Sequence, residues 1–173
     1  MNDTIRISGV MDESIVDGKG MRYTIFTQGC PHACPGCHNP DTHDFRGGKE
    51  VTIQRLLDEI LENPMLKGVT FSGGEPFCQP APLAKLAQEI RAAAPKLDVT
   101  IFTGYTWEEL QKKQDSDVDA LLAQTDVLID GRFVEEKKDL TLLFRGSTNQ
   151  RVIDVPKTLA SGNLILLGTA EGY

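Results

Sequence analysis

Apolar residues along this chain follow two periods in turn, one typical of helices and one typical of strands. Between 51 and 63, Ile53, Leu56, Leu57 and Ile60 fall at the spacing of one helical face. The segment 83–94 repeats this pattern, and 118–124 predicts a shorter helix. Short runs rich in β-branched residues lie between the helical segments. The strands that these runs predict are 22–27, 68–72, 99–103 and 127–130.

The middle of the chain also carries a helix start signal. Thr106 is followed three residues later by Glu109, the pair that forms a capping box. Further along, 152–155 and 164–167 are apolar runs, either of which could be a strand. No linker, repeat or low-complexity segment interrupts the pattern.

Strands that alternate with helices predict a parallel sheet with helices packed against it. A closed eight-fold barrel takes about 250 residues, whereas this chain has 173. We therefore expect an α/β fold in which residues 1–173 form a single domain. That domain is predicted to be a partial (β/α) barrel, open at one side.

Each predicted strand leads into a polar or glycine-rich cluster. The first leads into a loop with three cysteines. The next three lead into Ser72-Gly73-Gly74-Glu75-Pro76, Thr103-Gly104-Tyr105 and Asp130-Gly131-Arg132. Because ligands of such folds gather at the carboxyl ends of the strands, these clusters predict one site at one rim.

Charge excludes several classes of partner. The chain has 18 basic and 25 acidic side chains, a formal charge of −7. Broad binding to nucleic acid or to anionic membranes would favour a basic face. No apolar stretch is long enough to span a bilayer, and residues 1–10 do not resemble a signal peptide. We expect a cytoplasmic protein in reducing surroundings.

The most specific chemical signal is the spacing of Cys30, Cys34 and Cys37 in a C-x3-C-x2-C run. Three thiolates so close together suit one compact soft group, and four-iron clusters are held by cysteine thiolates. A run with three thiolates leaves one iron without a protein ligand. Such an open iron is a place where a small molecule can bind and react.

The cysteine spacing allows two other interpretations. A disulfide would leave one of the three cysteines over, and it would require an oxidising compartment. Structural zinc usually takes four ligands. The side chains that could supply the fourth are His32, His38, His43 and Cys78.

Gly73-Gly74-Glu75-Pro76 is a weak signal by itself, because glycines and proline are sufficient for a turn that ends a strand. Because this turn lies on the same rim as the cysteines, it also predicts contact with a ligand. Glycines allow a ligand to approach the backbone closely, and carbonyl groups or Glu75 can accept hydrogen bonds from an ammonium group.

The cysteine run followed later by Gly-Gly-Glu-Pro resembles the radical S-adenosylmethionine superfamily. The resemblance implies that the three cysteines hold a 4Fe-4S cluster. It also implies that the amino and carboxylate groups of S-adenosylmethionine chelate the fourth iron. One electron then cleaves the sulfonium and yields methionine and a 5′-deoxyadenosyl radical, which abstracts hydrogen.

Other segments narrow this resemblance. Segment 14–22 is similar to the entry segment of glycyl-radical-enzyme activases, although Lys19 stands where proline is common. Pro35-Gly36-Cys37, 126–133 and 144–154 resemble the activating-enzyme family of the anaerobic, class III ribonucleoside-triphosphate reductase. The resemblance implies hydrogen abstraction from a glycine near the carboxyl terminus of the large reductase subunit. It also implies a flavodoxin- or ferredoxin-type electron donor.

The resemblance implies roles by matching position. Cys30, Cys34 and Cys37 would be the cluster ligands. The positions that would contact S-adenosylmethionine are Gly36, His38, Gly73, Gly74, Glu75, Asp130 and Arg132. His38 could instead be a plain surface side chain, and Arg132, where lysine is common, could form a structural ion pair. Polar side chains that could meet either cofactor or partner are Arg145, Asn149 and Arg151. We expect Cys78 to be an incidental thiol.

An open barrel cannot enclose a small substrate, but it can admit a loop of another protein. This favours an activase. Two alternatives stay open at this point: activation of another glycyl-radical enzyme such as pyruvate formate-lyase, and a non-catalytic iron–sulfur module for electron transfer.

Overall fold

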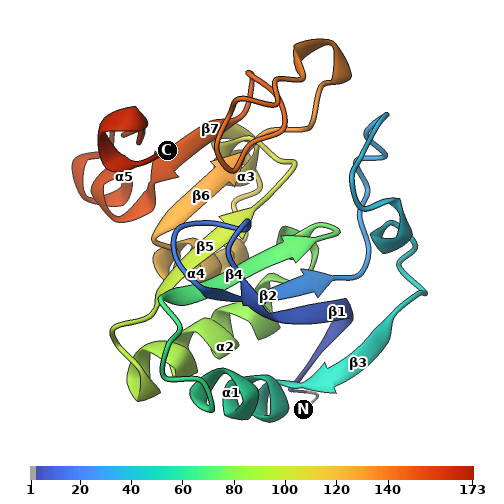
Figure 1. The fold of residues 1–173 in the computed structure, drawn as a ribbon, viewed down its shortest axis with the longest axis vertical. Coiled ribbons are helices and arrows are strands. Elements are labelled where there is room, and N and C mark those ends of the chain that lie inside the picture. The colour runs from blue at the N-terminus through green and yellow to red at the C-terminus, as the bar shows by residue number, and fades with distance from the viewer. Residues whose placement is uncertain (1–2) are drawn as a thin grey trace.

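A computed structural model describes residues 3–173 and shows a seven-stranded sheet in the order β3-β1-β2-β4-β5-β6-β7 (Figure 1). The strands are β1 (Thr4–Ser14), β2 (Arg22–Thr27), β3 (Lys49–Thr52), β4 (Gly68–Gly73), β5 (Asp98–Phe102), β6 (Val127–Asp130) and β7 (Arg151–Asp154). The helices are α1 (Ile53–Leu61), α2 (Pro80–Ala93), α3 (Trp107–Lys112), α4 (Ser116–Ala123) and α5 (Val155–Ser161).

The predicted α/β fold with an open sheet is confirmed, but the sheet is parallel only at its core. Strands β2, β4, β5 and β6 pair in parallel, as expected from the order of the elements. At the edges, β1 runs antiparallel to β2 and β3, and β7 runs antiparallel to β6. The prediction of a parallel sheet therefore holds for the four core strands and does not hold at the two edges.

The sequence pattern missed β1 and β3, and both strands depend on long-range pairing. Only Ile5 and Ile7 of the first half of β1 are buried apolar residues, and the second half is mostly exposed. Residue 51 was expected inside a helix, but Val51 pairs with Ile5 in the sheet. The helix therefore begins at Ile53, where the side chain of Thr52 accepts a hydrogen bond from the amide of Arg55.

The other predicted elements lie within a few residues of their expected bounds. The capping box of Thr106 and Glu109 starts α3 as predicted. Of the two later apolar runs, 152–155 supplies β7. Run 164–167 does not form a strand, and its pairing with the sheet is one isolated bridge from Leu166 to Ile153.

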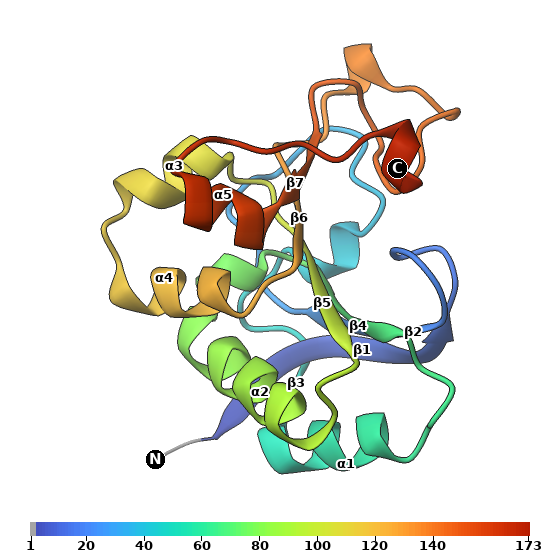
Figure 2. The same ribbon diagram turned by 90° about the vertical axis from the view of Figure 1, so that its left-hand side faces the viewer.

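All five helices lie on the same side of the sheet (Figure 2). The main core fills the space between them and the sheet, and it includes Leu56 of α1, Leu86 of α2 and Phe71 of β4. With one face so covered, the carboxyl ends of the parallel strands and the loops beyond them remain available for a site. Among the helices of the described chain, none combines the length and apolarity that crossing a bilayer requires.

Candidate active site

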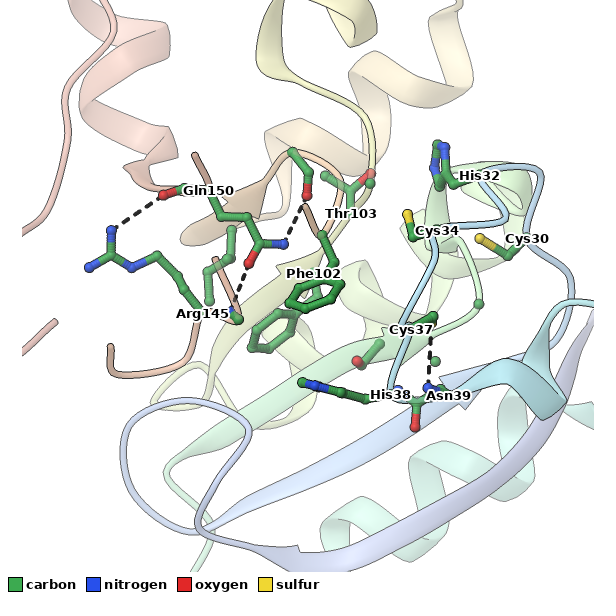
Figure 3. Close-up of a pocket in the computed structure, with 18 of the residues that line it drawn as sticks. Cys30, His32, Cys34, Cys37, His38, Asn39, Phe102, Thr103, Arg145 and Gln150 are labelled. Atoms are coloured by element: carbon green, nitrogen blue, oxygen red, sulfur yellow. Dashed lines mark hydrogen bonds between the residues drawn. The ribbon is translucent and has the colours of Figure 1, made fainter. Parts of the chain in front are cut away.

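A pocket of about 390 Å³ lies where the parallel strands end (Figure 3). Its walls include the cysteine loop, residues 72–74 at the end of β4, residues 102–104 at the end of β5, and residues 144–146 before β7. The volume falls in the range of roughly 300–1,000 Å³ that is usual for small-molecule sites. The predicted meeting of the strand-end clusters at one rim is thus confirmed for these segments.

All three cysteines of the run line this pocket. The loop that carries them is closed on itself by backbone hydrogen bonds. The amide of Gly29 donates to the carbonyl of Thr42 at 2.6 Å, and the amide of Cys30 donates to the carbonyl of His43 at 3.1 Å. Within the run, the amide of Cys37 donates to the carbonyl of Cys34 at 3.1 Å. The thiols are therefore presented from a braced loop.

The donor set fits an iron–sulfur cluster. The cysteines of the run are free thiols, and burial raises the pKa of the Cys30 thiol. A bound cation would hold it as the thiolate. In residues 3–173, no three His, Cys, Asp or Glu side chains gather closely enough to share one metal ion. Because the thiolates of a four-iron cluster bind different irons, three free thiols in one loop can each bind a different iron of such a cluster.

Gly73 and Gly74 bring β4 close to the cysteine loop. Gly73 has φ +87°, and a Cβ on it would lie 2.6 Å from the amide nitrogen of Thr27. A Cβ on Gly74 would lie against the carbonyl of Gly29. The backbone amide of Gly74 donates to Thr27, and that of Glu75 donates to Gly29, both at 2.8 Å. Both glycines line the pocket, and both are also required by this close backbone packing.

Replacing Gly74 by alanine is therefore expected to destabilise the protein by about 2 kcal/mol, within the usual cost of overpacking. The added methyl group would push the cysteine loop away from β4, so iron binding should weaken as well. Urea unfolding of the anaerobic apoprotein measures the first effect, and iron analysis measures the second. Gly9→Ala is the matched control, because nothing lies within 4 Å of the corresponding Cβ. Equal stability of the two variants would contradict the prediction.

Glu75 is buried and does not line the pocket. Its Oε1 accepts hydrogen bonds from His32 Nε2 at 2.6 Å and from the Gly104 amide at 2.8 Å. Its Oε2 accepts from the Phe77 amide at 3.0 Å and from Thr103 Oγ1 at 2.8 Å. The carboxylate thus joins the cysteine loop to the ends of β4 and β5. Contact between Glu75 and the cofactor stays a prediction. For that contact to form, one of the four hydrogen bonds to the carboxylate would have to break.

Asp130 and Arg132 are both engaged in ion pairs. Asp130 is buried and binds Arg151, with 2.5 Å between Oδ2 and Nη2. Arg132 lies 3.0 Å from Glu109, and that guanidinium holds the pKa of Glu109 down at about 2. Of residues 130–132, Gly131 alone lines the pocket. The structural ion pair foreseen for Arg132 is present, and the predicted contacts of both residues with the cofactor stay predictions.

Gly36 and His38 face the loop that follows β6. The His38 ring lines the pocket and lies 5.3 Å from the Phe133 ring. Gly36 has φ +75°, and a Cβ there would lie 3.2 Å from Phe133 and 3.3 Å from Glu135. Glycine at this position therefore allows the cysteine loop to pack closely on residues 133–135.

The remaining polar candidates lie in different places. Arg145 lines the pocket opposite the cysteines, and its guanidinium points away from them (Figure 3). Asn149 donates to the Arg132 carbonyl at 2.8 Å, and Arg151 also pairs with Glu108. Cys78 is exposed and lies outside the pocket, and desolvation of its thiol, with Glu75 nearby, raises its pKa to about 11.

Several pocket residues have no specific role predicted by the sequence. The sequence offers His43 only as a possible fourth zinc ligand, yet its Nε2 lies 3.4 Å from Cys37 Sγ. Phe102 lines the pocket without belonging to any motif, and Gln150 lines it from segment 144–154, where the sequence assigned it no role. The signal for Phe102 in the sequence is nearness to a strand end, which many ordinary residues share.

A pocket at the carboxyl ends of parallel strands, walled by three free thiols, is the arrangement expected of an iron–sulfur protein of the radical S-adenosylmethionine type. The family described as "4Fe-4S single cluster domain" matches residues 16–153. Within that class, the chain belongs to the family of anaerobic ribonucleoside-triphosphate reductase-activating proteins.

Three relatives illustrate this membership. The activating protein of Escherichia coli (strain K12) is 41% identical over 80% of this chain and 91% of its own length. That of Haemophilus influenzae is 36% identical over 79% and 89%, respectively. That of Enterobacteria phage T4 is 32% identical over 79% and 86%. Among solved structures, QueE from Escherichia coli aligns with 60% of this chain and 54% of its own at a TM-score of 0.44 and 20% identity.

Proposed function

We propose that this protein activates an anaerobic ribonucleoside-triphosphate reductase by cleaving S-adenosylmethionine reductively at a 4Fe-4S cluster. When bound, the reduced cluster supplies the electron that breaks the sulfonium bond, giving methionine and a 5′-deoxyadenosyl radical that takes hydrogen from a glycine of the reductase. The observation that carries the proposal is the placement of Cys30, Cys34 and Cys37 together in the pocket wall.

Different residues of the chain would bind the cluster and the two ends of S-adenosylmethionine. The three cysteines hold the cluster, and the backbone hydrogen bonds of their loop keep the thiols in position. Phe102, Ile129 and Phe144 give the pocket an apolar wall, which suits the nucleoside part of S-adenosylmethionine and keeps water from it. Gly73 and Gly74 place backbone at the rim beside the cysteine loop, where the methionine end is expected.

The partner is the large reductase subunit, whose glycine-bearing segment would complete the open side of the pocket. The electron would come from a flavodoxin- or ferredoxin-type donor. A cluster with an open iron suits the reducing cytoplasm. The shared seven-stranded sheet supports treating residues 1–173 as one catalytic domain.

Cleavage of S-adenosylmethionine tests the proposal without the partner. Under dithionite and without oxygen, the reconstituted protein should release 5′-deoxyadenosine and methionine, measured by chromatography. Cys30→Ala, Cys34→Ala and Cys37→Ala should each reduce release to background, because each removes a thiolate ligand of the cluster. Cys78→Ser is the control and should retain both iron and cleavage.

Two results would contradict this assignment. Loss of iron from Cys78→Ser as complete as from the other variants would show that the ligands are wrongly identified. Reduction and reoxidation of the wild-type cluster without any cleavage would favour the non-catalytic electron-transfer alternative.

A further inference from the structure

Two nitrogen atoms, one of an imidazole and one of a backbone amide, converge on the sulfur of Cys37. The imidazole Nε2 of His43 and the backbone amide of Asn39 each lie 3.4 Å from Cys37 Sγ. Both distances are within the range of hydrogen bonds to sulfur. Both His43 and Asn39 line the same pocket as the cysteines. Cys37 is therefore the thiol of the run on which a side-chain donor and a backbone donor are focused.

His43 is held in place by the segment around it. Its carbonyl accepts a hydrogen bond from the Cys30 amide, and the neighbouring Thr42 carbonyl accepts from Gly29. The buried side chain of Gln28 donates to the carbonyls of Asp41 at 3.0 Å and Asp44 at 2.7 Å. The residues on both sides of His43 are therefore held by hydrogen bonds. These contacts of the cysteine loop keep the imidazole close to the Cys37 sulfur.

The direction of the hydrogen bond follows from the chemistry of the sulfur. A thiolate bound to iron has no proton to donate, so the imidazole must donate from Nε2. A histidine that donates to a ligand sulfur contacts that ligand from outside the cluster. Such hydrogen bonds are one of the factors that set the reduction potentials of iron–sulfur clusters.

We infer that His43 tunes the cluster by donating its Nε2–H to Cys37 Sγ, which makes one-electron reduction of the cluster more favourable. Reduction adds negative charge, and the ligand sulfurs carry part of it. A hydrogen bond to a charged acceptor is stronger than one to a neutral acceptor, so the donor stabilises the reduced form more than the oxidised form. His43 is a positioning residue in this role, and the inference rests on the proposed function only in taking Cys37 as a cluster ligand.

Redox titration of the reconstituted protein tests this role without the reductase or S-adenosylmethionine. Iron and sulfide contents are measured first, and the reduced cluster is then followed by electron paramagnetic resonance at poised potentials. His43→Phe keeps an aromatic ring but removes the donor. We expect its equilibrium constant for reduction to fall about tenfold, which corresponds to about 59 mV for a one-electron couple. His43→Gln keeps an N–H donor of similar reach and should recover much of the difference.

His38→Phe is the matched control, because it makes the same change at another histidine of this pocket. His38 contacts Phe133, and the hydrogen bonds to Cys37 Sγ come from His43 and Asn39. Its potential should stay near that of the wild-type protein.

The outcomes separate this inference from the proposed function. A His43→Phe protein with full iron and an unchanged potential would overturn the inference alone. If His43→Phe loses its iron, His43→Leu repeats the comparison with a smaller side chain. Loss of iron from both would show that His43 is needed for cluster binding and would overturn the tuning role. A wild-type protein that cannot be loaded with a four-iron cluster would overturn both.

Discussion

Mixed without oxygen with the anaerobic reductase, S-adenosylmethionine and a one-electron donor, this protein is expected to place a radical on a single glycine of the reductase. Electron paramagnetic resonance should show a doublet, because one α-hydrogen remains on that glycine. Deuteration of the glycine should collapse the splitting. The signal should disappear when S-adenosylmethionine is omitted or when Cys37→Ala is used, since Cys37 lies in the pocket with the other two thiols.

The choice of partner is tested in the same experiment. Pyruvate formate-lyase, supplied in place of the reductase, should stay free of the radical. A radical on that enzyme and never on the reductase would support the alternative activase. The protein could also cleave S-adenosylmethionine without forming a radical on either partner. That result would support the proposed cleavage reaction but would refute the reductase as the protein substrate.

Glu75→Gln is expected to lower the free energy of unfolding by about 3 kcal/mol, the upper part of the range for leaving a buried donor unpaired. Each carboxylate oxygen accepts one backbone N–H, Oε1 from Gly104 and Oε2 from Phe77. A backbone amide cannot reverse its role. Whichever way the glutamine amide turns, its NH₂ group therefore faces a backbone donor inside the protein.

Urea unfolding of the anaerobic apoprotein measures this effect. Glu109→Gln is the matched control, because the Glu109 side chain is 40% exposed in its pair with Arg132. Glu109→Gln should lower the free energy of unfolding by less than about 1 kcal/mol, as is usual for exposed ion pairs. Iron retention should also fall in Glu75→Gln, since His32 of the cysteine loop binds Oε1. Equal stability of the two variants would show that the Glu75 contacts can rearrange without cost.

The local elements of the fold were predictable because their causes are local. Helix α2 and the four parallel strands follow from apolar periodicity within each segment. The start of α3 follows from two residues one helical turn apart. Strands β1 and β3 were not predictable in this way, because their pairing joins residues such as Ile5 and Val51 that lie far apart in the chain.

The candidate site likewise combines features that are local in the sequence with features that depend on tertiary contacts. The spacing of Cys30, Cys34 and Cys37 determined the class of chemistry, because it depends on residue types within one short loop. The roles of polar residues around the rim depend on which partners lie nearby. Asp130 matched a motif for cofactor contact, yet its carboxylate binds Arg151, which only the pairing of β6 with β7 brings beside it.

The sequence by itself therefore determined the order of most helices and strands, the iron–sulfur character of the site and the rim on which it lies. Only the tertiary structure decided that Glu75 accepts from four donors, and that the imidazole of His43 lies within hydrogen-bonding distance of Cys37 Sγ. The physical reason is that a hydrogen bond requires its two groups to come within about 3.5 Å at a suitable angle. Periodicity and spacing predict backbone elements, but such distances depend on how those elements pack.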